Sequence, residues 1–483
     1  MQGLTAVLNI AKGALSSNQF AMQVISHNLA NVNTPGYTRQ RANLVSEPPV
    51  GSGRLKLGMG VGVSSVSQAF DHYTTRAVQQ NTSSLKEHEA EASILSQVES
   101  LFNDTGESGL AHTLDAFWGA WQDVANNPGG MAERTALLQK GQILAGQFNN
   151  LSAELNRIKE NLNASVATGV QNVNKITSQI AELNEKIVAA EASGTTANDY
   201  RDQRNNLLEQ LSGYVGTTIL EQGNGSATVL TASGLLLVDG SQHWDLSVQG
   251  NSVYYNQIPS DISGKLTGGQ IGGWLDMRDE TLPQYLANLD ELAGTIISQV
   301  NAAHVAGYPL AGARGKTFFR DFQVSPQVPN SANYAGAAAY MALSEDVQDH
   351  PENIAAGGLS GAPGDNENAL RIAALQTNGT LPIRTWTMAG RGQSNSSSLL
   401  TGTMSEYYQD LVGGIGILAE NSNENHSFVQ STLDRLGEIR DSISGVNLDE
   451  ELTEMMKIQR SYEAASKMVT VADQMMQDIL DMR

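Results

Sequence analysis

The chain has 483 residues, and 29 basic against 50 acidic residues give it a net charge of −21. A charge of this sign repels nucleic acid and anionic lipid, so we expect neither as a ligand. Cysteine is absent, which excludes disulfides, thiol catalysis, iron–sulfur clusters and zinc sites of the cysteine type. Apolar residues make up 40% of the chain, enough for real cores, and the length predicts roughly two to four domains.

The N-terminus shows no signal for the secretory pathway. It has no basic stretch, and Asn9 and Lys12 interrupt the apolar residues, so we expect no secretory signal peptide. No stretch approaches the roughly 18 apolar residues of a transmembrane helix, so we expect no membrane insertion. If the protein leaves the cytoplasm, another export route must carry it.

A heptad repeat marks the first predicted helix, which ends near Asn31 because Thr34 precedes a proline. Thr34-Pro35-Gly36-Tyr37 has Pro and Gly in the central places of a type II turn. The apolar series, in which Asn18 takes one place, is Leu4, Leu8, Ala11, Leu15, Met22, Ile25 and Leu29.

A second heptad repeat closes the chain. Residues 448–483 contain no Gly or Pro, and Asn447 with Glu450 predicts an N-terminal cap of the capping-box type. Six of the 14 methionines fall here, and such flexible side chains favour an interface over a fixed core. The repeat is Met455, Ile458, Tyr462, Ala465, Val469, Ala472, Met476 and Ile479.

The middle of the chain predicts more long helices and a small β part. Apolar periodicity indicates helices over residues 131–193, 280–306 and 405–444, the first with a stutter at Val166 and Val170. Short strands are predicted at 217–220, 227–230 and 235–238 between glycine-containing turns. Residues 307–400 are rich in Pro and Gly and predict a small β or mixed domain.

The predicted fold is therefore mainly α with small β or mixed insertions. We expect a discontinuous terminal coiled coil of residues 1–35 and 446–483. A long-helix domain would comprise 36–306 and 401–445, with its β part near 214–262, and 307–400 would be an inserted outer β or α+β domain. Residues 1–60 carry a net charge of +4 and residues 446–483 one of −4. This pattern favours an attraction between the two ends; the alternative is a chance distribution, because most of the N-terminal charge lies after the first helix.

The sequence offers no chemistry for an enzyme. Eight histidines are scattered without metal-ligand spacing, and HExxH, GxSxG and EF-hand patterns are absent. Gly315-Lys316-Thr317 resembles the end of a phosphate-binding loop, but Leu310 stands where that loop needs glycine. We therefore expect no catalytic residue, no metal and no cofactor.

Two motifs carry a family resemblance. Residues 26–40, SHNLANVNTPGYTRQ, resemble the N-terminal signature of bacterial flagellar axial proteins of the rod, hook and hook–filament junction. The PGYTRQ variant is most similar to the hook-associated protein 1 (FlgK type) family, and residues 452–465, LTEMMKIQRSYEAA, match its C-terminal helix. The signature residues are Asn28, Asn31, Asn33, Thr34, Pro35, Gly36 and Tyr37.

The resemblance implies a structural role in filament assembly and motility. Such a protein leaves through the flagellar type III export apparatus and forms a ring of identical subunits at the distal end of the hook, outside the cell. The implied partners are the hook protein, the second junction protein (hook-associated protein 3) and a cytoplasmic export chaperone. The implied assembly interface is Leu4, Leu8, Leu15, Met22, Ile25, Leu29, Met455, Ile458, Tyr462, Val469, Met476 and Ile479.

For the chaperone we expect contacts from the C-terminal helix, at Leu452, Met455, Ile458, Tyr462, Met468 and Val469. Two alternatives stay open. One is another axial protein of the same apparatus, the second junction protein or a hook variant. The other is a secreted adhesin or enzyme whose terminal helices serve only export.

Overall fold

The computed structural model describes residues 2–49, 58–102, 109–192, 194–256, 259–310, 313–321, 334–388, 390–391 and 395–481. The chain divides into two compact units. Unit 1 holds Met1–Leu85, Gln171–Leu246 and Phe428–Arg483, and unit 2 holds Lys86–Val170 and Ser247–Ser427. The prediction of a mainly helical chain with paired ends and small sheets is confirmed. The division into three domains stays a prediction.

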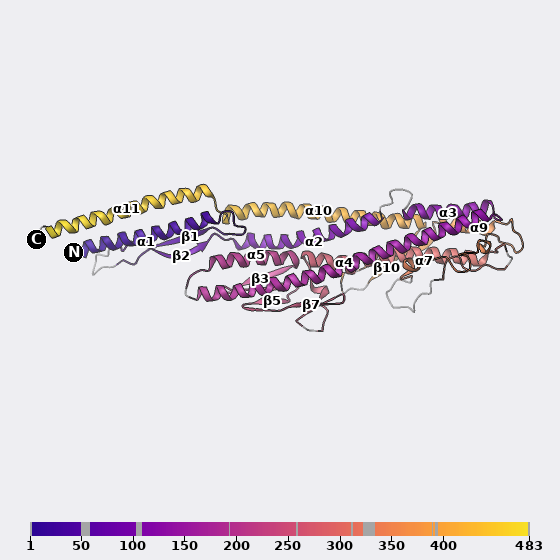
Figure 1. Ribbon diagram of the computed structural model, residues 1–483, viewed down its shortest axis with the longest axis horizontal. Helices are drawn as coiled ribbons and strands as arrows, with labels where there is room; N and C mark the ends of the chain where they lie inside the picture. The colour runs from indigo at the N-terminus through magenta and orange to yellow at the C-terminus, as the bar shows by residue number, and fades with distance from the viewer. Residues whose placement is uncertain are drawn as a thin grey trace. The chain divides into compact units, whose positions relative to one another are not determined.

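The first and last helices of the chain pack together in unit 1. Helix α1 (Gln2–Ala30) runs antiparallel to α11 (Leu448–Asp481), and both ends of the chain lie at the same end of this pair (Figure 1). After α1, the Tyr37 N–H donates to the carbonyl of Thr34 at 3.1 Å, and Gly36 has φ +74°. The predicted type II turn is therefore present.

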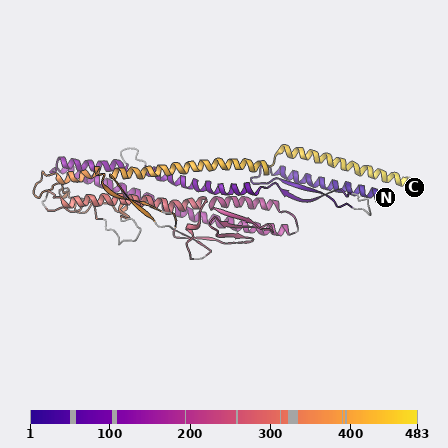
Figure 2. The ribbon, with the colours of Figure 1, turned by 180° about the vertical axis from the view of Figure 1, so that it is seen from behind.

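A β-hairpin packs against α1 as well. Strands β1 (Gln40–Ser46) and β2 (Val61–Gln68) are antiparallel and lie beside α1 in both views (Figures 1 and 2). The Ser17 hydroxyl donates to the carbonyl of Val61 at 3.1 Å. Because α1 has neighbours on two sides, its buried residues include the small Ala11, Ser17 and Ala21 as well as Ile25.

The rest of unit 1 is built around α5 (Asn198–Tyr214) and a four-stranded sheet. The predicted strands are confirmed, with β3 pairing β4, β4 pairing β5 and β5 pairing β6. Arg204 of α5 is fully buried and donates to the Gly225 carbonyl at 2.7 Å and to Glu221 at 2.8 Å. The strands are β3 (Thr217–Glu221), β4 (Ala227–Thr231), β5 (Leu236–Asp239) and β6 (Gln242–His243).

Three long helices contribute residues to both units. They are α2 (His72–Phe102), α4 (Met131–Glu191) and α10 (Met404–Ser444). The last two match the predicted helices to within two residues, whereas α2 was not predicted. Val166 and Val170 are both buried, so the apolar face of α4 continues through the predicted stutter.

Unit 2 surrounds an apolar core formed by several helices and the segments that follow α7. The described residues of 307–400 belong to this unit, and Phe318, Met341 and Ile383 contribute to the same core as Trp118 of α3. Its further elements are α3 (Leu110–Asn126), β8 (Ser252–Tyr255), α6 (Gly269–Asp276), the π-helical turn Met277–Thr281, α7 (Leu282–Ala306), α8 (Ala337–Tyr340), α9 (Glu367–Ala373), β9 (Leu381–Thr387) and β10 (Ser396–Gly402). Strand β7 (Leu246–Gln249) pairs with β8, and β9 pairs with β10.

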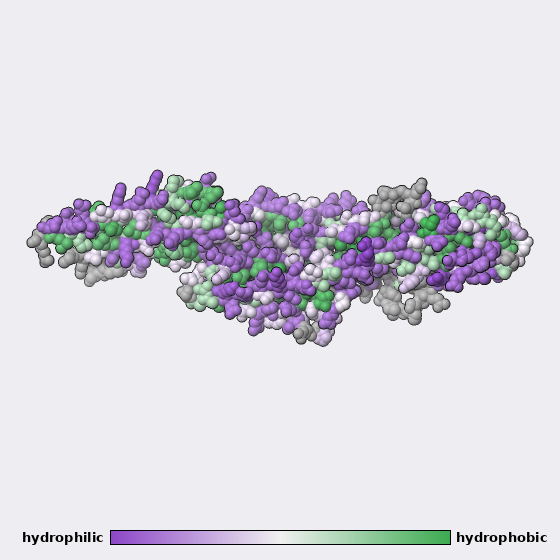
Figure 3. Space-filling model, viewed as in Figure 1, coloured by the Kyte–Doolittle hydropathy of each residue, from purple (hydrophilic) through white to green (hydrophobic). Residues whose placement is uncertain are grey.

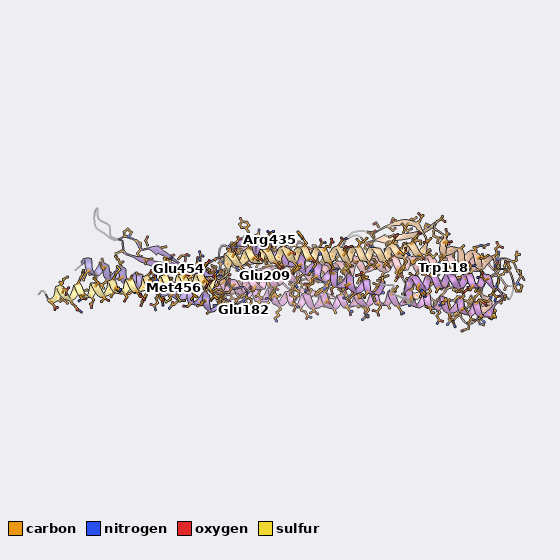
Figure 4. The ribbon with its side chains drawn as sticks, turned by 90° about the horizontal axis from the view of Figure 1, so that it is seen from above. Trp118, Glu182, Glu209, Arg435, Glu454 and Met456 are labelled. Carbon is orange, nitrogen blue, oxygen red and sulfur yellow. The ribbon has the colours of Figure 1, made fainter. Side chains whose placement is uncertain are left out.

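An aromatic cluster in this core encloses a histidine. Trp118, labelled in Figure 4, and Trp121 are buried on α3, and the Trp121 ring lies 6.1 Å from that of His304. His304 is fully buried, with Nδ1 against the Lys316 carbonyl and Nε2 accepting from the Ala355 N–H at 3.0 Å. Burial lowers the pKa of His304 to about 4, so the ring stays neutral.

We expect the buried, neutral His304 to make a contribution to the stability of unit 2 that is lost in acid. Its folded pKa lies below the unfolded value, so the contribution is complete above about pH 6.5 and is lost as the pH falls toward 4. We expect the loss to be about 2–3 kcal/mol and to be absent in His304→Gln. Denaturant unfolding followed by tryptophan fluorescence can measure it, because four of the five tryptophans lie in unit 2.

Wild type and His304→Gln must be compared because two buried carboxyl groups also change the stability of unit 2 with pH. Burial raises the pKa values of Asp276 and Asp290 to about 6, so their protonation at low pH stabilises the folded state, opposite to the effect of His304. Both carboxylates are common to wild type and variant, so the difference isolates His304. An identical pH dependence in the two proteins would contradict the prediction.

Candidate functional site

The signature residues gather where α1, the hairpin, α5 and α11 meet, all within unit 1. We call this meeting point the joint and define it by Asn28, Tyr37, Arg39, Asp202 and Glu451. Two of these, Asn28 and Tyr37, were predicted as signature residues. Arg39 lies in the quoted motif, whereas Asp202 and Glu451 lie outside both motifs, and nothing in the sequence singled them out.

The side-chain amide of Asn28 is at the centre of the joint. Its Nδ2 donates to the Gln40 carbonyl at 2.9 Å and to Oε2 of Glu451 at 3.0 Å. Its Oδ1 accepts from the Gln40 N–H at 3.0 Å and from the Tyr37 hydroxyl at 2.8 Å. Asn28 is 1% exposed, and both donors and both acceptor positions of its amide are used. One side chain thus connects α1, β1 and α11.

Arg39, the residue before β1, connects this part of the chain to the end of α10 and the start of α11. Its guanidinium lies 2.7 Å from Glu450 and 2.6 Å from the buried Glu451, and its N–H donates to the Ser444 carbonyl at 2.9 Å. Asn447 caps α11 as predicted, accepting from the Asp449 N–H at 2.9 Å. Glu450, expected to complete the capping box, accepts from Arg39 instead. The charge attraction predicted between the chain ends is therefore concentrated at Arg39, and Arg54 and Lys56 lie outside the described residues.

Asp202 anchors the loop after α1 to helix α5. Its carboxylate accepts from the N–H and the hydroxyl of Thr38, at 2.9 and 2.5 Å, and from Nε2 of Gln68 at 2.9 Å. Burial raises the pKa of Asp202 to about 6, although the hydrogen bonds from Thr38 oppose that rise. Gln40 adds a bond to Asp199 at 2.8 Å. The start of α5 therefore holds both the loop and the hairpin.

Tyr37 closes the joint from the side of the turn. Its hydroxyl donates to Asn28 and lies 3.0 Å from Nδ1 of His27. Burial, followed by the nearby carboxylates of Asp199, Asp202 and Glu451, raises the pKa of Tyr37, so the phenol stays protonated. The Tyr37 hydroxyl must keep its proton to donate the hydrogen bond to Asn28.

The remaining signature residues shape the turn rather than the buried contacts. Asn31 donates to the His27 carbonyl at 3.0 Å and accepts from the Thr34 hydroxyl at 3.1 Å, which closes the last turn of α1. Asn33, Thr34, Pro35 and Gly36 are exposed. Gly36 has a positive φ, and it also has no room for a side chain, because an added Cβ would lie 1.9 Å from Oδ1 of Asn206. The turn therefore requires glycine for two separate reasons.

The predicted interface residues lie along the α1–α11 pair to different depths. Ile25 is buried, whereas Leu4, Leu8, Leu15, Met22 and Leu29 are half-buried. On α11 the most buried side chains are Glu451, Ala465 and Ala472. Met455, Ile458 and Val469 are half-buried, and Tyr462, Met476 and Ile479 are exposed. The pair thus buries one face of each helix and leaves other apolar side chains in contact with solvent.

One group of carboxylates in the described residues has the spacing of metal ligands. Oxygens of Glu87, Glu91 and Asp276 lie within 4.8 Å of one another in unit 2. Burial raises the pKa of Glu87 and that of Asp276, and Arg391 forms an ion pair with Asp276 at 2.8 Å. The raised pKa values favour the protonated carboxyl groups, and Arg391 offsets part of the negative charge, so both reduce the repulsion among the three side chains. No helix in the described part of the chain is long and apolar enough to cross a membrane.

Comparisons with known proteins agree with this arrangement. Residues 95–319 match the model of the flagellar hook-associated protein FlgK helical domain. Residues 8–38 match the flagella basal body rod protein family, and 441–482 match the C-terminal family of the rod proteins FlgEFG. The chain is 29% identical to flagellar hook-associated protein 1 of Bacillus subtilis, covering 98% of this chain and 97% of that protein.

The chain belongs to the flagellar hook-associated protein 1 (FlgK) family. A second relative, flagellar hook-associated protein 1 of Salmonella typhimurium, is 26% identical. The similarity covers 99% of this chain and all of that protein. The fold resembles that of the flagellar hook junction protein FlgK from Burkholderia pseudomallei, with a TM-score of 0.65 over 76% of this chain at 16% identity. The family is structural and not enzymatic, and its place is the hook–filament junction outside the cell. The expectations of a junction protein without catalytic activity are therefore confirmed.

Asn28 gives the sharpest test of the joint. Asn28→Leu keeps the size of the side chain but leaves the Gln40 backbone groups and Glu451 without their buried partner. We expect a loss of about 2–5 kcal/mol in the stability of the α1–α11 pair. Amide hydrogen exchange over 2–30 and 448–481 should accelerate, while unit 2 keeps its protection.

Asn31→Leu is the matched control, because Asn31 bonds only within its own turn. It should accelerate exchange much less. Equal effects of the two variants would show that the buried amide is not the special contact we describe.

Proposed function

We propose that this chain forms the junction by self-association of its terminal helices into a ring of identical subunits. The hook protein would lie on one side of the ring and the second junction protein on the other. The observation that carries the proposal is the α1–α11 pair itself. It is fixed at one end by the buried joint and still exposes large apolar side chains along α11, including Leu452, Met456 and Val471. An isolated soluble pair gains nothing from such exposure.

The proposed assembly interface keeps the twelve residues predicted from the sequence, and their burial supports two roles. The buried and half-buried members, such as Ile25 and Ile458, support packing within the pair. The exposed members, such as Tyr462 and Ile479, support contacts with neighbours. Family membership favours this role over that of the second junction protein or a hook variant, and over a secreted adhesin or enzyme.

Substitution of Ile25 tests the proposal in cells. Ile25 is 6% exposed, so Ile25→Asp replaces about 1.5–3 kcal/mol of apolar burial with a desolvated carboxylate. We expect cells that carry only this variant to form hooks without filaments and to shed flagellin, as judged by electron microscopy and by protein in the medium. The tryptophan unfolding transition of unit 2 should be unchanged.

Gln23→Asp is the control, because Gln23 is exposed on the same helix and the change adds the same charge. Its cells should grow normal filaments. Normal filaments in the Ile25→Asp strain would contradict a role for the terminal pair.

We also propose that an export chaperone holds α11 before assembly, and that the chain leaves through the flagellar type III apparatus. Of the six residues proposed for the chaperone, Leu452, Tyr462 and Met468 are exposed. Met455, Ile458 and Val469 are half-buried in the pair. A chaperone that covers all six must therefore compete with α1.

Competition of this kind predicts opposite effects of two deletions. Removal of 448–481 should abolish chaperone binding, whereas removal of 2–30 should strengthen it, because α11 is then free. Isothermal titration of the two shortened chains against the chaperone measures both. Undiminished binding after loss of 448–481 would place the chaperone site elsewhere.

A further inference from the structure

Among the apolar side chains that helix α11 leaves exposed beside α1 are two groups on different faces of the helix. Ala465 and Ala472 are buried in the pair, and we assign them to heptad position a. Position d is then Met468 and Met475, and position g is Val471, which together we call the groove strip. Leu452 falls at b and Met456 at f, and these two form the ridge strip. On a heptad wheel the two strips face about 150° apart.

The groove strip forms one wall of an apolar hollow. Leu4 and Val7 of α1 form the opposite wall, and the hollow has a volume of about 350 Å³. Met468, Val471 and Met475 are 44%, 53% and 52% exposed. In Figure 3 apolar surface follows the line between α1 and α11. The hollow is thus an open apolar groove with Lys467 among its lining residues.

The ridge strip lies in the first turns of α11, on the other flank. Leu452 is 45% exposed and Met456 is 54% exposed, and Met456 is labelled on this helix in Figure 4. Arg460 follows one turn later and is exposed. Arg460 falls at heptad position c, next to position f of Met456, so a positive charge follows the two apolar side chains at the edge of the ridge strip.

We propose that the groove strip of one subunit receives the ridge strip of a second copy of this chain, with the two α11 helices parallel. The inference rests on the proposed function and adds the contact by which subunits meet. Different surfaces on opposite flanks give a head-to-tail contact, which closes into rings or extends into helices. Self-association through one flank alone would instead stop at a dimer.

The spacing of the two strips matches in register. Leu452 and Met456 are four residues apart, and so are Val471 and Met475, each 19 positions further along. A neighbour shifted along the helix axis by about 28 Å would therefore bring both pairs together. The same shift brings Arg460 next to Asp478, which lies at position g on the groove flank.

Charge decides the direction of the neighbour. In an antiparallel arrangement Leu452 would meet Met475 and Met456 would meet Val471, an equally good apolar match. That arrangement places Arg460 opposite Lys467, so two positive charges would face each other. The parallel arrangement pairs Arg460 with a carboxylate and is the one that we propose.

The absence of cysteine makes a direct test possible. Met456→Cys with Met475→Cys should give disulfide-linked multimers when flagella isolated from cells are oxidised, with loss of most of the monomer band. Leu452→Cys with Val471→Cys is a second pair at the same offset, in case the first variant assembles poorly. Ser461→Cys with Leu480→Cys is the matched control, because these exposed positions are also 19 residues apart but on exchanged flanks.

A ladder of multimers with either test pair and none with the control would support the proposal. Normal filaments without a ladder from either pair would overturn it and leave the proposed function standing. Ladders from the test and control pairs alike would also overturn it. So would a disulfide that joins the variant only to a chaperone-sized protein with a cysteine of its own. A wild-type chain that fails to restore filaments to a deletion strain would instead refute the proposed function.

Discussion

The geometry of the terminal helices depends on one side-chain amide buried among three elements. Asn28 uses all of its hydrogen-bonding capacity, and its partners come from the turn and the strand after α1 and from the first turn of α11. A buried amide tolerates few alternative arrangements, because any shift leaves a polar group without a partner. The joint therefore sets the register between α1 and α11, whereas the apolar seam beyond it could slide by a heptad with little change in burial.

The same joint explains why the family signature clusters around one turn. Gly36 is needed for the backbone path, and Tyr37 and Asn28 provide the buried contacts. The carboxylate of Asp202, on helix α5, accepts hydrogen bonds from the N–H and the hydroxyl of Thr38. These bonds tie the orientation of the terminal helix pair to the rest of unit 1. These contacts hold α1, the turn after it and helix α5 in fixed positions relative to one another.

Much of the fold could be predicted from the sequence because long helices repeat their pattern many times. The ends of α4, α10 and α11 follow from that repetition and from the Asn447 cap. Helix α2 was missed because Thr, Ser and Gln occupy much of its surface and weaken its apolar pattern. Asp202 and Glu451 could not be found, because a single buried carboxylate leaves no periodic mark, and their partners are 164 and 423 residues away in the chain.

The contact between Asn28 and Glu451 joins residues 423 positions apart, so it forms only after nearly the whole chain is available. A chain cut short before Glu451 would leave the Asn28 amide with an unpaired donor, Arg39 without its buried partner and α1 without a helix to pack against. Such a fragment could still fold its unit 2 and yet would lack a defined end with which to enter a polymer. The joint therefore separates chains that reach Glu451 from shorter ones, because only a chain that contains Glu451 can form these contacts.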